Sequence, residues 1–232
     1  MGTIGIIGAM EVEVQELKEQ MQAERLVKKA GMEFCEGILE GQRVVVVRSG
    51  VGKVNAAVCA QILVDVFDVN AVINTGIAGS LKAEINIGDL VISSDLVHHD
   101  MDAVSFGYPK GQIPQMDVFS FGADQELAEL AEKVCKEVNP EIQVFHGRVV
   151  SGDQFVADKE TKEKISTLFA GYCTEMEGAA IAQTAYLNQV PFVVLRAISD
   201  KADDSATVDY PAFEAKAIIH SVNLLTEIVR SI

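Results

Sequence analysis

Short apolar runs alternate along the chain with segments whose apolar residues recur at helical spacing. The runs are rich in β-branched residues and occupy residues 3–9, 71–80, 90–97, 144–150 and 190–200. Runs that are too short for a helix and lack polar alternation are typical of strands buried on both faces of a parallel sheet. Between the first two runs, Met10, Val14, Leu17 and Met21 mark the apolar face of a helix. The pattern predicts an α/β fold.

Further elements follow from the same pattern. Residues 34–39 and 43–47 predict a hairpin, and residues 71–80 predict a strand that ends in a loop of small residues. A helix is expected after Gly52, with a buried stripe of Val54, Ala57, Val58 and Ile62. Other helices are predicted at residues 124–138, at 159–169, after Glu177, and from Pro211 onward with Phe213, Ala217, Ile218, Val222, Leu225 and Val229 on one side.

Composition indicates an ordinary globular chain with a strong negative charge. Of 232 residues, 49% are apolar and 23% are charged, and the net charge is −15. Nucleic acid and anionic membrane surfaces would be repelled, so a neutral or cationic small molecule is the better partner. No linker, repeat or low-complexity tract interrupts the chain, which favours a single domain over residues 1–232.

The cysteines and the N-terminus indicate a cytoplasmic protein. The four cysteines lie far apart without a Cys-x-x-Cys pair, so they are interpreted as small buried apolar residues in a reducing compartment: Cys35, Cys59, Cys135 and Cys173. No basic segment precedes the first strand-like run, and no apolar run reaches membrane-spanning length.

Candidate chemistry lies at the end of the strand predicted at residues 190–200. Arg196, Ser199 and Asp200 follow the apolar run within five positions. In open α/β sheets, ligands bind beyond the carboxyl ends of strands, so these side chains could belong to a site. An equally ordinary interpretation is a strand end followed by a helix N-cap at Ser199 or Asp200.

Glu13 is a second candidate. At 100° per residue it lies about 40° from Leu17, at the edge of the first helix's apolar stripe. The neighbouring carboxylates of Glu11, Glu16 and Glu19 lie further toward solvent. Glu13 is therefore the one held nearest the core, although a simple rim charge would have the same spacing.

Three other segments could suggest sites. Residues 48–56 lack the first Gly and the Ser/Thr after Lys that a P-loop needs, so they predict a strand-to-helix turn. Residues 98–102 cluster His and Asp, but adjacent residues on an extended segment point in opposite directions, which disfavours a metal site. The long loop at 101–122 is too apolar for a solvated linker and is expected to pack over the site or against a second subunit.

The polar residues that fall at predicted strand ends form a pocket with several carboxylates and one arginine. Separated carboxylates suit hydrolysis through an oxocarbenium-like transition state, in which one protonates the leaving group and another activates water. An acidic pocket also matches positive charge developing on a ribose.

Seven segments together resemble the bacterial 5′-methylthioadenosine/S-adenosylhomocysteine nucleosidases, nearly end to end: Gly5–Glu13, Ser49–Ala57, Asn74–Gly79, Phe106–Pro114, Val150–Phe155, Glu175–Glu177 and Val194–Asp200. The resemblance implies a nucleoside-phosphorylase-like fold with three αβα layers and a mixed, largely parallel central sheet. It also implies a homodimer, no cofactor or metal, and hydrolysis that releases adenine. Ile77 and Gly178-Ala179 depart from residues common in the family.

By position, the resemblance also implies roles for single residues. Asp200 would be the general acid at adenine N7, supported by Ser199, and Glu13 would activate a water that Arg196 helps to order. Burial at the end of an apolar strand would help Asp200 to hold a proton near neutrality. The residues implied to bind substrate are Met10, Val51, Ala78, Gly79, Phe155, Val156, Glu175, Met176, Glu177 and Tyr210. Those implied to come from the partner subunit are Ala103, Phe106, Tyr108 and Pro114.

Within the substrate set, the resemblance implies that Glu177 binds the ribose hydroxyls while Met10 and Met176 pack on the sugar. Phe155 would stack on adenine, and the backbone of Val156 would contact its edge. Val51 and Tyr210 would line the alkylthio pocket.

Four alternatives stay open. A purine nucleoside phosphorylase of the same fold would need a phosphate site, which a carboxylate at residue 13 would repel. An aminofutalosine hydrolase would differ only in substrate. A non-catalytic nucleoside-binding protein would have no need for Glu13. A dinucleotide-binding oxidoreductase is remote, because no Gly-x-Gly-x-x-Gly follows the first strand.

Overall fold

The computed structural model describes residues 2–232, except for the side chains of residues 207–212, 214–217 and 219–220. Its strands are β1 (Thr3–Gly8), β2 (Gln22–Lys29), β3 (Met32–Leu39), β4 (Gln42–Arg48), β5 (Val69–Ser80), β6 (Leu90–His98), β7 (Phe121–Gly122), β8 (Val144–Ser151), β9 (Cys173–Glu175) and β10 (Phe192–Asp200). Its α-helices are α1 (Glu11–Gln20), α2 (Lys53–Phe67), α3 (Gln125–Val138), α4 (Lys159–Phe169), α5 (Gly178–Asn188) and α6 (Ala206–Ser231).

All the strands belong to one mixed sheet, part of which closes into a ring. The order runs β10-β6-β8-β9-β5-β1-β4-β3-β2, and β10 also pairs with β5. β10 is therefore hydrogen-bonded on both edges, parallel to β5 and antiparallel to β6. The edge formed by β2, β3 and β4 is an antiparallel extension of this ring.

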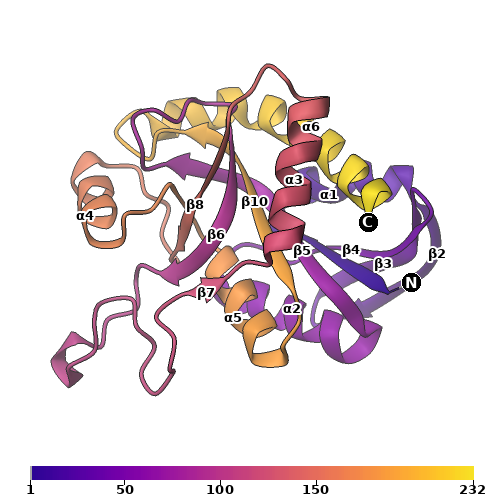
Figure 1. The fold of residues 1–232 in the computed structure, drawn as a ribbon, viewed down its shortest axis with the longest axis horizontal. Helices are drawn as coiled ribbons and strands as arrows, with labels where there is room; N and C mark the ends of the chain where they lie inside the picture. The colour runs from indigo at the N-terminus through magenta and orange to yellow at the C-terminus, as the bar shows by residue number, and fades with distance from the viewer. Residues whose placement is uncertain (1) are drawn as a thin grey trace.

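Helices cover both faces of the sheet, which confirms the expected mixed α/β architecture. α1, α3 and α6 pack together on one face, and α2 and α5 on the other (Figure 1). Alternate residues of a strand enter opposite clusters: Val44 and Val46 pack with α1 and α6, while Val45 and Val47 pack with α2. A strand covered on both faces has no solvent side, which explains its unbroken apolar sequence.

The predicted buried stripe of α2 was right for Ile62, which is buried, but wrong for Val54 and Val58. Val54 is 74% exposed and Val58 is also exposed, whereas Ala56, Cys59 and Leu63 are buried against the sheet. α2 is apolar on several sides, so periodicity alone does not identify its inner face. The helix therefore presents an apolar outer surface.

Other boundaries differ from prediction. β5 continues through residues 76–80, which were expected to form a loop. α6 begins at Ala206 rather than Pro211, with Ser205 as its N-cap, so the alternative of a cap at Ser199 or Asp200 was wrong. Phe213 was expected on the buried side of α6 but is 39% exposed, whereas Val222 is fully buried.

Two further expectations concern the loop and the cysteines. The loop at 101–122 contains one 3₁₀ turn, Val104–Phe106, and projects from the body of the molecule at the lower left of Figure 1. All four cysteines are free and buried, as predicted. Within the described part of the chain, no helix is long and apolar enough to cross a membrane.

Candidate active site

A cavity of about 250 Å³ lies beyond the ends of β5, β9 and β10 and the start of α1. Its walls come from segments far apart in sequence, because the ends of the ring strands meet there. The residues that line it are Ala9, Met10, Glu13, Val51, Ile77, Ala78, Gly79, Phe155, Thr174, Glu175, Met176, Glu177, Ser199 and Asp200. Glu13 and Asp200, predicted to act together, thus line one cavity.

Glu13 is held at the first turn of α1 by backbone donors. Its Oε2 accepts hydrogen bonds from the N–H of Ala9 at 2.6 Å and of Met10 at 2.9 Å, and its Oε1 accepts from the N–H of Ile77 at 3.3 Å. The residue is only 5% exposed, so the interpretation as a rim charge was wrong. Burial raises the pKa of Glu13, and the backbone donors and the charge of Arg196 oppose that rise.

The position of Glu13 also depends on Gly76. A Cβ at residue 76 would lie 2.8 Å from Glu13 Oε1 and 3.3 Å from Arg196 Nη1. The chain therefore needs glycine here for the carboxylate to approach the backbone of β5.

Asp200 is the last residue of β10 and is 2% exposed. Its Oδ1 accepts a hydrogen bond from the N–H of Ala202 at 2.7 Å, and its Oδ2 accepts from the Ser199 hydroxyl at 2.9 Å. That hydroxyl also lies 3.4 Å from the carbonyl oxygen of Ala78. A Cβ at Gly79 would come within 2.8 Å of Asp200 Oδ1, so glycine is again needed beside the carboxyl group.

Arg196 lies behind the cavity wall and is paired with Glu175. Its Nη2 donates to Glu175 Oε2 and to Asn74 Oδ1, both at 2.6 Å. Glu175 also accepts from the Ser151 hydroxyl and from the N–H of Gly178. Burial opposes ionisation of Glu175, but Arg196 and these donors together hold its pKa below the usual range. Ser151 was not singled out from the sequence.

Glu177 is the third buried carboxylate, and it is 6% exposed. Its Oε1 accepts a hydrogen bond from the N–H of Gly52 at 2.8 Å, across 125 positions of sequence. Burial and the neighbouring charge of Glu175 raise the pKa of Glu177 to about 7. Glu177 can therefore change its charge near neutral pH.

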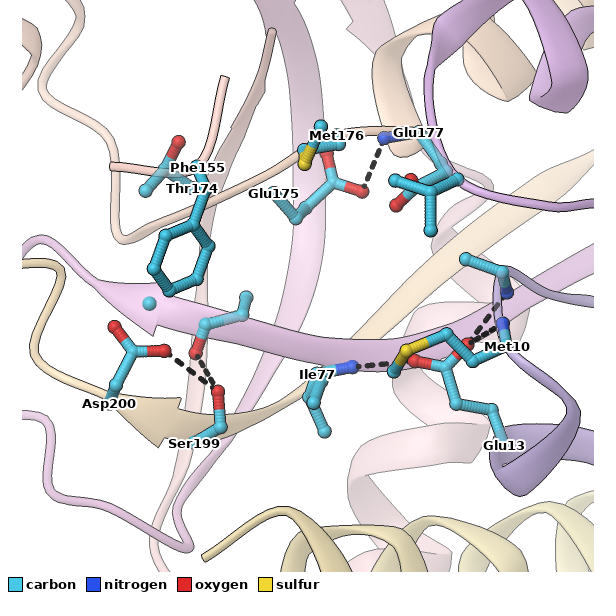
Figure 2. A pocket seen from close by; sticks show the side chains of 14 residues that line it. Met10, Glu13, Ile77, Phe155, Thr174, Glu175, Met176, Glu177, Ser199 and Asp200 are labelled. Carbon is cyan, nitrogen blue, oxygen red and sulfur yellow. Dashed lines mark hydrogen bonds between the residues drawn. The ribbon is translucent and has the colours of Figure 1, made fainter. Parts of the chain in front are cut away.

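Figure 2 shows how the cavity separates its functional groups. Asp200, Ser199 and Phe155 gather at one end, and Glu13 and Met10 lie at the other, with Glu175 and Glu177 along a third side. An acid and a base at opposite ends of one cavity can act on two faces of a bound molecule.

Some predicted residues lie elsewhere. The side chain of Val156 is buried in a small apolar cluster with Phe169 of α4 and does not line the cavity, so only the backbone of this residue is available for the predicted contact with adenine. The side chain of Tyr210 is outside the described residues. Ala103, Phe106, Tyr108 and Pro114 belong to the projecting loop and do not line this cavity in the described chain.

Three lining residues were not among the predicted site residues. Ala9, Ile77 and Thr174 line the cavity, and each is the immediate chain neighbour of a predicted site residue. Ile77 had been noted only as a departure from the residue common in the family, and for Ala9 and Thr174 the adjacency to predicted residues was the main signal in the sequence. Among the residues that the structure describes, no cluster of His, Cys, Asp or Glu could hold a metal ion.

Comparison with known proteins identifies the family. The model of the phosphorylase superfamily matches residues 3–230. The chain belongs to this superfamily. Within the phosphorylase superfamily, it is similar to the 5′-methylthioadenosine/S-adenosylhomocysteine nucleosidase of Bacillus cereus strain G9842, with 40% identity over 230 residues and 99% of each chain covered. The resemblance expected from the motifs is confirmed.

Two solved structures have the same fold as this chain. The first is the 5′-methylthioadenosine/S-adenosylhomocysteine nucleosidase from Neisseria meningitidis in complex with methylthio-immucillin-A. Its TM-score is 0.96 and its sequence identity 39%, and the match covers 100% of both chains. The futalosine hydrolase of Helicobacter pylori has a TM-score of 0.94 and 34% identity, covering 100% of this chain and 98% of that one.

Proposed function

We propose that the chain hydrolyses the N-glycosidic bond of 5′-methylthioadenosine and S-adenosylhomocysteine, and also of 5′-deoxyadenosine, and releases adenine. The observation that carries the proposal is the placement of Glu13 and Asp200 at opposite ends of one cavity. The family and the names of its full-length relatives support the choice of substrates.

The proposed reaction breaks the bond between N9 of adenine and C1′ of the ribose. The bonding electrons leave with adenine, whose N7 takes the proton of Asp200. Water attacks C1′ and gives its proton to Glu13. Each of these proton transfers is typically worth ~10²–10⁴-fold in rate.

The remaining groups hold the substrate. Phe155 stacks on adenine next to Asp200, and the backbone of Val156 contacts the adenine edge. Met10 and Met176 pack on the sugar, whose hydroxyls Glu177 binds. Arg196 helps to order the water, and the carboxylates around the cavity stabilise the positive charge that develops on the ribose. Val51 lines the alkylthio end of the cavity.

The contacts of Glu13 favour hydrolysis over phosphorolysis. Convergent backbone N–H groups are a common way to bind phosphate, and here three of them converge on Glu13. Its carboxylate therefore occupies the donors that a phosphate would use, and its charge would repel one.

A futalosine-type nucleoside is the second candidate substrate. The observation in its favour is the likeness to the Helicobacter pylori futalosine hydrolase, although the sequence identity is lower than to the two nucleosidases. Both candidates share the bond that breaks and differ in the group beyond the ribose.

We also infer that two copies of the chain form the working unit. Val54 and Val58 on α2 expose apolar surface, and Phe106 at the tip of the projecting loop is 83% exposed. Exposed apolar patches mark interaction surfaces. In this arrangement Ala103, Phe106, Tyr108 and Pro114 of each chain would complete the alkylthio end of the partner's cavity.

Chromatography of the products tests the proposal. The chain is incubated with 5′-methylthioadenosine, S-adenosylhomocysteine, 5′-deoxyadenosine or an aminofutalosine, each with and without phosphate. We expect each thioether nucleoside to release free adenine and a free reducing sugar. For a given nucleoside, the rate should be the same with and without phosphate. A sugar phosphate, or adenine only in the presence of phosphate, would contradict hydrolysis. Intact nucleosides in every reaction would indicate a binding protein.

A further inference from the structure

One peptide unit next to the site is held from both sides. The amide N–H of Ala202 donates to Asp200 Oδ1 at 2.7 Å. The carbonyl of the same peptide, which belongs to Lys201, accepts a hydrogen bond from Lys162 Nζ at 2.5 Å. Lys162 lies in α4, which contributes no residue to the cavity wall. An ammonium group is thus joined to the carboxyl group of Asp200 through a single peptide.

This peptide is fixed in an uncommon conformation. Ala202 has φ of 50°, in the left-handed region that residues other than glycine rarely adopt. Its side chain is fully buried and packs with Ile165 and Phe169 of α4. A strained residue persists only where its surroundings hold it, and here α4 supplies both the apolar contact and the ammonium group.

Lys162 is mostly buried and lies close to a second carboxylate. Its side chain is 17% exposed, and its Nζ also lies 3.3 Å from Asp203 Oδ2. A cation on the carbonyl oxygen polarises the peptide and makes its N–H a stronger donor, as in other hydrogen-bonded chains. Because the N–H of Ala202 occupies Oδ1, the oxygen left to carry a proton is Oδ2, on the side of Ser199.

We propose that Lys162 is a positioning residue for the general acid, acting through the Lys201–Ala202 peptide on Asp200. The inference rests on the proposed function, because it assigns Asp200 the proton that goes to adenine. Lys162 touches no substrate in this scheme. Its removal is expected to slow the departure of a base that needs protonation.

A purely structural role of Lys162 would have a different consequence. If Lys162 only fixed the loop, its loss would slow every reaction at the site equally. A leaving group that departs without a proton separates the two roles, because its departure does not depend on Asp200. The 4-nitrophenyl 5-methylthioriboside is such a substrate, since nitrophenolate is stable as an anion.

The experiment compares Lys162→Met, Lys162→Arg and the wild-type chain on 5′-methylthioadenosine and on the nitrophenyl riboside. We expect Lys162→Met to lower kcat for adenine release roughly tenfold, with KM within about twofold and the nitrophenyl rate within about twofold. Lys162→Arg, which keeps a cation that can reach the carbonyl, should restore most of the activity.

Two lysines serve as controls. Lys164 is exposed two positions along the same helix, and Lys164→Met should behave as wild type on both substrates. Lys201 Nζ donates to the carbonyl of Ile85, so Lys201→Met loosens the same loop without removing the cation from the peptide. It should lower the melting temperature but change both rates by the same factor.

The outcomes separate the inference from the proposed function. Equal losses of Lys162→Met on both substrates, or wild-type kcat for adenine release, would overturn the inference and leave the proposed function standing. A wild-type chain that releases no adenine from any nucleoside would overturn both.

Discussion

The N–H of Gly52 donates to the carboxylate of Glu177, joining the turn before α2 to the residue proposed to bind the ribose. The turn is also held by hydrogen bonds among three charged residues. Lys53 Nζ contacts both oxygens of Asp100 at 2.6 and 2.7 Å, Asp100 accepts the N–H of Asp153, and Asp153 accepts the N–H of Lys53. We call Lys53, Asp100 and Asp153 the clamp. It links the turn before α2, the end of β6 and the loop that carries Phe155.

Substrate binding should weaken as Glu177 takes up a proton. Burial and the charge of Glu175 raise the pKa of Glu177 to about 7, so the carboxylate is ionised above this pH and neutral below it. The ionised form is the better acceptor for ribose hydroxyls. We therefore expect KM for 5′-methylthioadenosine to rise about tenfold from about pH 8 to about pH 6. Glu177→Gln should show a high KM that no longer follows this change. A wild-type KM that is flat over this range would contradict the assignment.

Breaking the clamp should cost stability and loosen the site. Asp100→Asn removes a charge that is partly buried, with 29% of the side chain exposed. Hydrogen bonds to charged groups and partly exposed ion pairs suggest a loss of about 1–2 kcal/mol in the free energy of unfolding, measured by urea denaturation. KM should rise, because the clamp holds both Gly52 and the Phe155 loop. Asp102→Asn is the matched control, since the Asp102–Lys110 pair is more exposed and should be worth less than about 0.5 kcal/mol.

Removing the Glu13 carboxylate should convert its donors into an anion site. In Glu13→Ala the N–H groups of Ala9, Met10 and Ile77 lose their acceptor. We expect inorganic phosphate to raise the melting temperature of this variant by about 2–4 °C, as binding to the folded state alone does. The wild type and Glu16→Ala, which changes an exposed residue of the same helix, should not respond. Stabilisation of the wild type by phosphate would argue for a phosphorylase. Adenine release by Glu13→Ala should fall ~10²–10⁴-fold.

The role of Asp200 as the general acid can be tested by an isosteric substitution. Asp200→Asn keeps the shape of the side chain and an oxygen for the N–H of Ala202, so the fold should survive, as circular dichroism and melting curves can show. The amide cannot protonate adenine, and kcat should fall ~10²–10⁴-fold. A variant that still releases adenine at the wild-type rate would remove Asp200 from the mechanism.

The proposed pairing of two chains predicts a linked loss of assembly and activity. Val54→Glu places a charge on the exposed apolar face of α2 and should yield monomers in sedimentation experiments. KM should rise, because the partner's loop no longer completes the cavity. Leu26→Glu, at a site on β2 that is 56% exposed, should remain dimeric and active. A monomeric and fully active wild type would refute the pairing.

The fold could be predicted for strands that are buried on both faces of the sheet and for helices that have one clear apolar stripe. The predicted bounds of α4, residues 159–169, match the structure, because its period is simple and Asp158 caps it. β2 was missed: seven of its eight residues are exposed, so it shows no alternation. On α2, Ile62 was correctly predicted to be buried, but Val54 and Val58 were assigned to the inner face because the outer face of this helix is apolar too.

The site could be predicted in part. Helical geometry placed Glu13 nearest the core, and the polar end of β10 gave Arg196, Ser199 and Asp200. The contact between Gly52 and Glu177 spans 125 positions, and no local pattern reports it. The partnership of Lys162 with the Lys201–Ala202 peptide depends on how α4 packs, which a single sequence does not show.

The two-sided pairing of β10 has a consequence for how nucleosides enter and adenine leaves. β10 is paired with β5 along its length and with β6 at Leu195–Ala197, so it cannot slide without breaking both ladders, and we expect Asp200 to keep its place during turnover. The movement that admits the nucleoside and releases the products is then expected at the half-exposed rim of the cavity around Val51 and Phe155. Substitutions that stiffen or loosen this rim should alter how fast products escape while leaving bond cleavage itself untouched.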